Sequence, residues 1–266
     1  MISSSSNSQV KNLNLLQKKS KVREEQGAFV IEGLRMFNEA KEANLLLKTY
    51  ASETFYSEKL LEDKTYFDNL DYEVISDHIF NGISETKTPQ GIMGIVKKPR
   101  FTLDEILKPS NPFLLLLEDI RDPGNLGTII RTAEGAGVSG IILNDSCVDM
   151  FNPKVIRSTM GSIFRLPFYQ ASDFINTLEI IRNQGVLIYA AHLDGKIYDA
   201  EDGFIKSCGF LIGNEANGLS ETASDMANMR IKIPMEGKVE SLNAAVASAI
   251  LMYEAARQRR NHIKSK

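Results

Sequence analysis

Residues 231 to 250 read Ile231-Lys-Ile-Pro-Met-Glu-Gly-Lys-Val-Glu-Ser-Leu-Asn-Ala-Ala-Val-Ala-Ser-Ala-Ile250. The pattern predicts a short apolar strand, then a loop that contains a glycine, then a helix rich in small residues that begins near Ser241-Leu-Asn243. Such a loop can turn backbone groups toward a ligand, and Ser241 and Asn243 add short hydroxyl and amide groups beside them. The stretch therefore predicts a ligand loop between a strand and a helix.

Two earlier stretches share this design of an apolar strand followed by a polar turn. They read Leu114-Leu-Leu-Leu-Glu-Asp-Ile-Arg-Asp-Pro-Gly-Asn-Leu-Gly-Thr-Ile-Ile-Arg131 and Gly209-Phe-Leu-Ile-Gly-Asn-Glu-Ala-Asn-Gly-Leu-Ser220. In open α/β sheets the ligand crevice lies at the carboxyl ends of the strands. Because all three polar turns follow strands, we expect them to meet at one edge of a sheet.

Together, and in this order, the three stretches resemble the signature motifs of the SpoU (TrmH-like) RNA ribose methyltransferases, over residues 111–259. The resemblance implies S-adenosyl-L-methionine as cofactor and methylation of a ribose 2′-hydroxyl in structured RNA, with 23S ribosomal RNA favoured. It also implies two groups of site residues. The catalytic group is Asn125, Arg131, Glu215, Ser241 and Asn243, and the cofactor-binding group is Gly213, Ile233 and Leu242.

The first of these motifs also has a purely structural interpretation. The run from Arg121 to Asn125 has strong turn chemistry, and Asn125 could cap the helix that follows. Arg131 lies six residues further on, just under two helical turns, so it could be an ordinary surface arginine. As a functional group, its guanidinium matches phosphate oxygens and stays protonated, which makes it a poor base. We therefore expect Arg131 to act through a substrate phosphate, with Ser241, Asn243 or water nearer the proton.

The chain is predicted to contain two α/β domains. Residues 1–97 alternate short strands and helices, including a helix from Ser57 to Leu70, and the stretch 21–35 is similar to the opening of L30e-like RNA-binding domains. A generic α/β unit is the alternative. Residues 98–111 form a linker, and 112–266 a methyltransferase domain with strands suited to a mostly parallel sheet. For this domain the resemblance implies the SPOUT fold with a deep trefoil knot, and a homodimer.

Composition favours a soluble cytoplasmic protein, with 43% hydrophobic and 24% charged residues, no membrane-length apolar run and no signal core. Cys147 and Cys208 have no metal-binding spacing with the three histidines, so no metal is expected. A net charge of −3 argues against indiscriminate nucleic-acid binding. A basic cluster near the start could nevertheless supply RNA affinity, or simply be solvated; it comprises Lys18, Lys19, Lys21 and Arg23.

Other functions stay open at this point. An RNA base methyltransferase or a tRNA ribose methyltransferase of the same superfamily would share most of the motifs, and a non-catalytic RNA-binding protein could keep the fold. A dinucleotide-binding site at Gly135-Ala-Gly-Val-Ser-Gly140 is rejected, because this run ends a predicted helix and opens a strand, whereas the fingerprint requires the reverse order.

Overall fold

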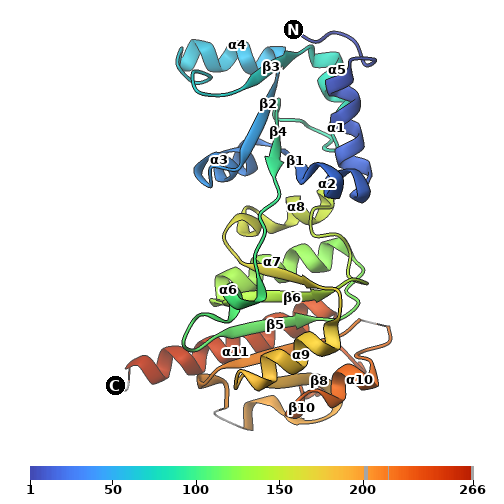
Figure 1. Ribbon diagram of the computed structural model, residues 1–266, viewed down its shortest axis with the longest axis vertical. Helices are drawn as coiled ribbons and strands as arrows, with labels where there is room; N and C mark the ends of the chain where they lie inside the picture. The colour runs from blue at the N-terminus through green and yellow to red at the C-terminus, as the bar shows by residue number, and fades with distance from the viewer. Residues whose placement is uncertain (201–202, 215, 265–266) are drawn as a thin grey trace. The chain divides into compact units, whose positions relative to one another are not determined.

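A computed structural model of the chain describes residues 1–200, 203–214 and 216–264, and these residues form two compact units (Figure 1). Unit 1 consists of Met1–Pro99 together with Asp149–Phe164. Unit 2 consists of Arg100–Val148 together with the chain from Arg165 onward. The chain therefore passes between the units three times, once through the predicted linker and twice around the segment 149–164.

Unit 1 is built on a four-stranded mixed sheet in the order β1-β4-β2-β3, in which β4 is antiparallel to both β1 and β2. Its strands are β1 (Ala28–Glu32), β2 (Leu46–Ser52), β3 (Tyr72–Ile75) and β4 (Ile92–Lys97). Its helices are α1 (Ser8–Lys18), α2 (Ser20–Gln26), α3 (Leu34–Glu42), α4 (Glu53–Glu62), α5 (Asp77–Ile83) and α8 (Pro153–Thr159). The apolar runs 28–32, 45–51, 73–75 and 91–96 predict these strands to within one residue, whereas α1, α2 and α5 were not predicted.

The start of α4 differs from the prediction. The sequence predicts a helix over Ser57–Leu70 with Ser57 as its cap, but α4 both begins and ends earlier. The Ser52 hydroxyl accepts a hydrogen bond from the Phe55 amide at 3.2 Å. A serine before the first helical residue satisfies an amide that the helix leaves without an internal partner. Ser57 instead lies inside the helix and donates to the Glu53 carbonyl.

Unit 2 contains a six-stranded sheet in the order β10-β8-β9-β5-β6-β7, and every neighbouring pair is parallel. Its strands are β5 (Phe113–Leu117), β6 (Gly140–Asn144), β7 (Phe168–Ala171), β8 (Leu187–Ile197), β9 (Cys208–Ile212) and β10 (Met229–Lys232). Its helices are α6 (Leu103–Leu107), α7 (Pro123–Ala136), α9 (Phe174–Asn183), α10 (Glu221–Asp225) and α11 (Ala244–Lys264). The runs 113–118, 140–144, 186–191, 210–213 and 230–233 predict five of these strands, whereas β7 was not predicted.

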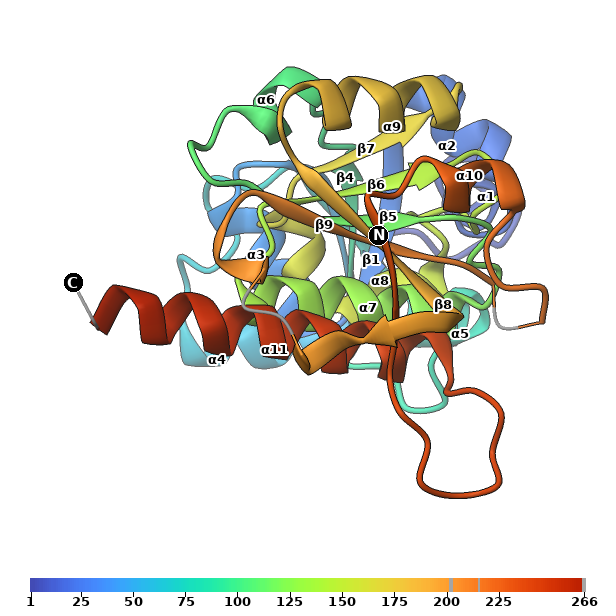
Figure 2. The same ribbon diagram turned by 90° about the horizontal axis from the view of Figure 1, so that it is seen from below.

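Helices cover both faces of this sheet, as Figure 2 shows. On one face, α6, α9 and α10 bury Ile106, Leu178 and Ala223 against the sheet residues Leu114 and Leu116. On the other face lie α7 and α11. Because both faces are buried, β5 consists entirely of apolar residues, as is typical of a parallel strand with two covered sides.

The segment Asp149–Phe164 carries apolar side chains into the core of unit 1. The ring centroids of Phe151 and Phe29 lie 4.8 Å apart. The side chains of Val155, Ile156 and Ile163 are at most 1% exposed. Full burial of each such side chain contributes about 1.5–3 kcal/mol to stability. The fold of unit 1 therefore depends on residues that are distant from it in the sequence.

The basic cluster near the start of the chain does not act as one group. Lys18, Lys19 and Lys21 are exposed, but Arg23 is only 3% exposed and forms an ion pair with Asp149. The expectation that Arg23 would contact RNA is therefore wrong, because its guanidinium is already bound inside the protein.

None of the described helices combines the length and the apolar character needed to cross a membrane.

Candidate active site

The loops that follow β5, β9 and β10 meet at one edge of the unit 2 sheet. Strand order explains this, because β5 and β9 are direct neighbours and β8 alone separates β9 from β10. All these strands run in the same direction, so their carboxyl ends lie together. The predicted convergence of the three polar turns is confirmed by hydrogen bonds between them.

Two of these hydrogen-bonded links join the β5 loop to the β9 loop. The Glu118 carboxylate accepts from both the amide and the hydroxyl of Ser220, each at 2.7 Å. The Asn214 side-chain amide donates to the Asp119 carbonyl at 2.9 Å. The predicted site residues did not include Glu118, Asn214 or Ser220. Glu118 and Asn214 are polar residues close behind buried strands, and Ser220 is a helix cap before α10, which were the available signals.

A third link joins the β5 loop to the start of α11. The Asn243 side-chain amide donates to the Asn125 side-chain oxygen at 3.0 Å, although 118 residues separate the two in sequence. The Asn243 oxygen accepts from the amides of Ala245 and Val246, at 2.9 and 3.3 Å, so this residue caps α11 as predicted. Two of the expected catalytic residues are thus in direct contact.

Asn125 itself is not the cap of α7, which was the structural alternative to its catalytic role. Asp122 caps α7, accepting a hydrogen bond from the Asn125 amide at 2.8 Å, and Pro123 is the first helical residue. Proline is well suited to that position because its missing N–H would have no partner there. With the cap supplied by Asp122, the Asn125 side chain is available to bond to Asn243.

We expect Asn243→Asp to separate the two roles of this residue. The carboxylate keeps an acceptor for the amides at the start of α11, so the melting temperature should change little. It cannot donate to the Asn125 oxygen, so the link between the loops should be lost and turnover should fall. Asn243→Ala, the comparison variant, should also lose about 1 kcal/mol of helix-cap stability. Thermal unfolding and steady-state kinetics of both variants measure the two effects. Full activity in Asn243→Asp would show that the link is dispensable.

Arg131 lies on α7, two turns after the beginning of the helix, and its side chain is exposed. Among the residues that the structure describes, none forms a hydrogen bond or an ion pair with its guanidinium. A nearby arginine of unit 2 behaves differently, since Arg165 is engaged with Glu134 at 2.9 Å. Arg131 can therefore offer its full set of donors to an anionic group such as a phosphate.

The turn after β9 depends on glycine for a reason that the sequence did not reveal. A Cβ atom on Gly213 would lie 2.3 Å from the Gly218 carbonyl carbon and 2.4 Å from the Leu219 nitrogen. Asn214 and Gly218 exchange two backbone hydrogen bonds that close this turn, and Gly218 has a φ of +68°. The close approach at Gly213 is thus made by the chain's own backbone. Glu215, the remaining predicted catalytic residue of the turn, lies outside the described residues.

The loop between β10 and α11 contains the other predicted cofactor-binding residues. Ile233 and Leu242 are half-buried at its two ends, and Ser241 is exposed. Within the described parts of the chain, no hydrogen bond involves residues 233–242. Their backbone donors and acceptors are therefore available to a ligand, which suits a cofactor held mainly through main-chain groups.

Cys147 lies beneath the β5 loop, where the Ile120 amide donates to its sulfur at 3.3 Å. Burial raises the pKa of this thiol to about 11. Since the folded pKa lies above the ordinary value, the thiol stays protonated until the pH approaches 11. We expect iodoacetamide at pH 8 to leave Cys147 unmodified in the folded protein and to alkylate it in urea. Mass spectrometry of the labelled peptide checks this, and rapid labelling of the folded protein would contradict the burial.

Two family profiles match the chain. The profile of the SpoU rRNA Methylase family matches residues 112–253, and that of the MRM3-like substrate binding domain matches residues 7–94. The first match contains all three loops of the candidate site.

Individual proteins are similar over nearly the whole chain. A 23S rRNA guanosine 2′-O-methyltransferase of Bacillus subtilis is 32% identical over 95% of this chain and 97% of its own length. The crystal structure of an rRNA methyltransferase from Sinorhizobium meliloti is 32% identical, with a TM-score of 0.80 and 96% of both chains covered. A SpoU methyltransferase of Streptomyces viridochromogenes, solved with the cofactor AdoMet, gives a TM-score of 0.82 at 26% identity, covering 96% of this chain and all of the other.

Proposed function

Because this chain belongs to the SpoU rRNA methylase family, we propose that it transfers a methyl group from S-adenosyl-L-methionine (AdoMet) to a ribose 2′-hydroxyl of 23S ribosomal RNA. The observation that carries the proposal is the hydrogen bond between Asn125 and Asn243. It brings the first and third motifs together beside a turn whose backbone is tightly closed. Full-length similarity to a 23S rRNA 2′-O-methyltransferase supports the substrate class.

The residues at the edge of the sheet suit AdoMet. Gly213 closes one turn, and Ile233 and Leu242 bound a loop whose backbone groups have no partner among the described residues. These three residues are the ones we propose to hold the cofactor. When bound, AdoMet supplies an electrophilic methyl group on a sulfonium centre. The protein then has only to align the 2′-hydroxyl and assist the loss of its proton.

We assign the substrate side of the site to Arg131. Its exposed guanidinium can hold a phosphate next to the target ribose, which aligns the 2′-oxygen without any change in protonation of the arginine. Ser241 and Asn243 are short polar residues at the start of α11 that can direct the hydroxyl proton toward water. The contact between Asn125 and Asn243 keeps the two loops at a fixed separation during this step.

The proposal includes a homodimer. Helix α11 exposes Val246 and Tyr253, 48% and 49% accessible, on an apolar strip that a second copy of the chain could cover. Light scattering should give twice the mass of one chain. We further propose the trefoil knot of the SPOUT fold, supported by the family match over residues 112–253, and a cytoplasmic location.

The function is tested by incubating the purified protein with total RNA and AdoMet that carries a radiolabelled methyl group. Separation of the RNA followed by nuclease digestion should give label in 2′-O-methylated nucleosides from 23S rRNA. Label in tRNA would identify the protein as a tRNA ribose methyltransferase. Label on a base would identify it as an RNA base methyltransferase. No incorporation into any RNA, with AdoMet binding intact, would favour a non-catalytic RNA-binding protein.

A further inference from the structure

Residues at the end of β6 and just after it form hydrogen bonds with the backbone of the catalytic loop after β5; these bonds are called the brace below. The Asn144 side-chain oxygen accepts from the Asp119 amide at 3.0 Å. The Val148 amide donates to the Ile120 carbonyl at 2.9 Å, beside the Cys147 sulfur that accepts from the Ile120 amide. Residues 144–148 therefore hold the backbone of the loop that leads directly into Asn125 and α7.

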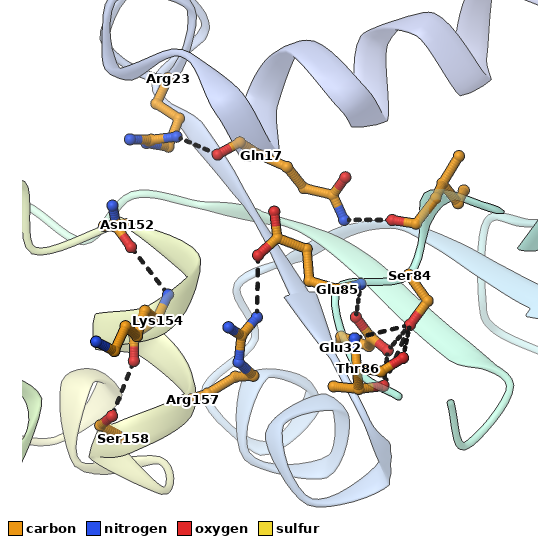
Figure 3. A network of polar contacts seen from close by, with 11 residues as sticks. Gln17, Arg23, Glu32, Ser84, Glu85, Thr86, Asn152, Lys154, Arg157 and Ser158 are labelled. Carbon is orange, nitrogen blue, oxygen red and sulfur yellow. Dashed lines mark hydrogen bonds and ion pairs between the residues drawn. The ribbon is translucent and has the colours of Figure 1, made fainter. Parts of the chain in front are cut away.

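The next residue along the chain, Asp149, already belongs to unit 1. One of its carboxylate oxygens accepts from two nitrogens of Arg23, at 2.8 and 2.5 Å. The third guanidinium nitrogen of Arg23 donates to the carbonyls of Leu16 and Gln17, at 2.6 and 3.0 Å, and Figure 3 shows the second of these contacts. The other oxygen of Asp149 accepts from the Phe151 amide. Among the described residues, Asp149 is the one carboxylate partner of this buried arginine, and it comes from the middle of the methyltransferase sequence.

Helix α8 continues this attachment. In Figure 3, Arg157 points toward Glu85 and lies 3.3 Å from its carboxylate. The Glu85 amide in turn donates to Glu32, whose carboxylate also accepts from Thr86 at 2.6 Å. The segment is thus fastened by charge at two places and by Phe151 in the core between them. Such a set of contacts gives the segment one defined position on unit 1.

We propose that Asp149 and Arg23 are positioning residues for methyl transfer, which couple the substrate-binding unit to the catalytic loop; the inference rests on the proposed function. One peptide bond, between Val148 and Asp149, separates the brace on Ile120 from the buried ion pair. Breaking the pair leaves a buried arginine without its counter-charge, which displaces Asp149 and loosens the brace. A small displacement of Asn125 is then sufficient to slow the reaction.

Asp149→Asn is the first test. Asparagine has the same shape and keeps an oxygen for the Phe151 amide, but it removes the charge that Arg23 requires. At saturating RNA and AdoMet, kcat should fall by roughly tenfold or more, because misplacement of reacting groups acts on turnover. The KM for RNA and the Kd for AdoMet should stay within about threefold, since neither site loses a contact. Hydrogen exchange at Ile120 and Val148 should become faster.

Two further variants serve as controls. Glu62→Gln removes an ion pair with Lys59 on α4 of unit 1 and should leave kcat and the exchange rates unchanged. Asp149→Glu keeps the charge and should recover part of the lost turnover. If Asp149→Asn unfolds at the assay temperature, the comparison of Asp149→Glu with wild type decides instead, with slowed turnover expected at unchanged RNA affinity.

The inference is overturned if the deciding variant keeps wild-type turnover, or if its RNA affinity falls while kcat does not. The second result would place Asp149 and Arg23 in RNA binding. Failure of the proposed function is a separate outcome, because the wild-type protein would then not methylate RNA. The exchange rates at Ile120 and Val148 still report on the coupling in that case.

Discussion

Replacing Arg131 with alanine is expected to reduce methyl transfer by at least about 100-fold, the scale of loss when a substrate is no longer held in the reacting geometry. The guanidinium is exposed and has no partner among the described residues, so its removal costs the fold little. AdoMet affinity should stay within a few-fold, because the proposed cofactor residues lie on the other two loops. Single-turnover kinetics and calorimetry measure the two quantities separately.

Two control variants sharpen this result. Arg131→Lys keeps the positive charge but loses the planar fork that binds two phosphate oxygens together, so it should recover only part of the rate. Arg182→Ala removes another exposed arginine, at the end of α9, and should leave the rate unchanged. If AdoMet affinity collapses together with activity in Arg131→Ala, the assignment of this residue to the substrate side is wrong.

Gly213→Ala is expected to impair both the fold and cofactor binding. The added Cβ would lie 2.3–2.4 Å from backbone atoms of Gly218 and Leu219, and backbone cannot move aside as a flexible side chain can. Overpacking of this kind costs about 1–3 kcal/mol of stability. The turn must open, so AdoMet affinity should fall by at least about tenfold, the equivalent of 1.4 kcal/mol. Chemical denaturation and calorimetry provide the measurements.

Gly82→Ala is the matched control for this substitution. A Cβ atom at Gly82 meets nothing within 4 Å, and this glycine lies inside α5, where alanine favours the helix. Its stability should therefore rise slightly and its cofactor affinity should not change. Normal AdoMet affinity in Gly213→Ala would show that the turn after β9 does not form part of the cofactor site.

Much of the candidate site could be predicted from local sequence. Strands β5 and β9 are continuous apolar runs that stop at polar residues, and the start of α11 was recognisable from Asn243. The convergence of their loops followed from the rule that parallel strands place their carboxyl ends at one edge. The hydrogen bonds between the loops could not be predicted from the sequence. Glu118 and Ser220, for example, are 102 residues apart, and periodicity contains no information on such pairs.

At several positions the local sequence allowed more than one structure, and only tertiary packing determined which one forms. Asp122 and Asn125 are both good capping residues, and only the actual start of α7 at Pro123 decided that Asp122 is the cap. Strand β7 is short and its pattern weak, so its place beside β6 became visible only in the sheet. Gly213 was expected to admit a ligand, whereas the tertiary structure assigns the close contact to the Gly218 backbone.

The sequence by itself determined the α/β class, most strands and helices and the order of three polar loops, because apolar periodicity and turn chemistry act between near neighbours. Only the tertiary structure decided that Asp149–Phe164 belongs with the first unit and that Arg23 faces inward while Lys18, Lys19 and Lys21 face solvent. The physical reason is that a buried charge needs a partner, and its partner lies 126 residues away. No local pattern distinguishes such an arginine from a solvated one.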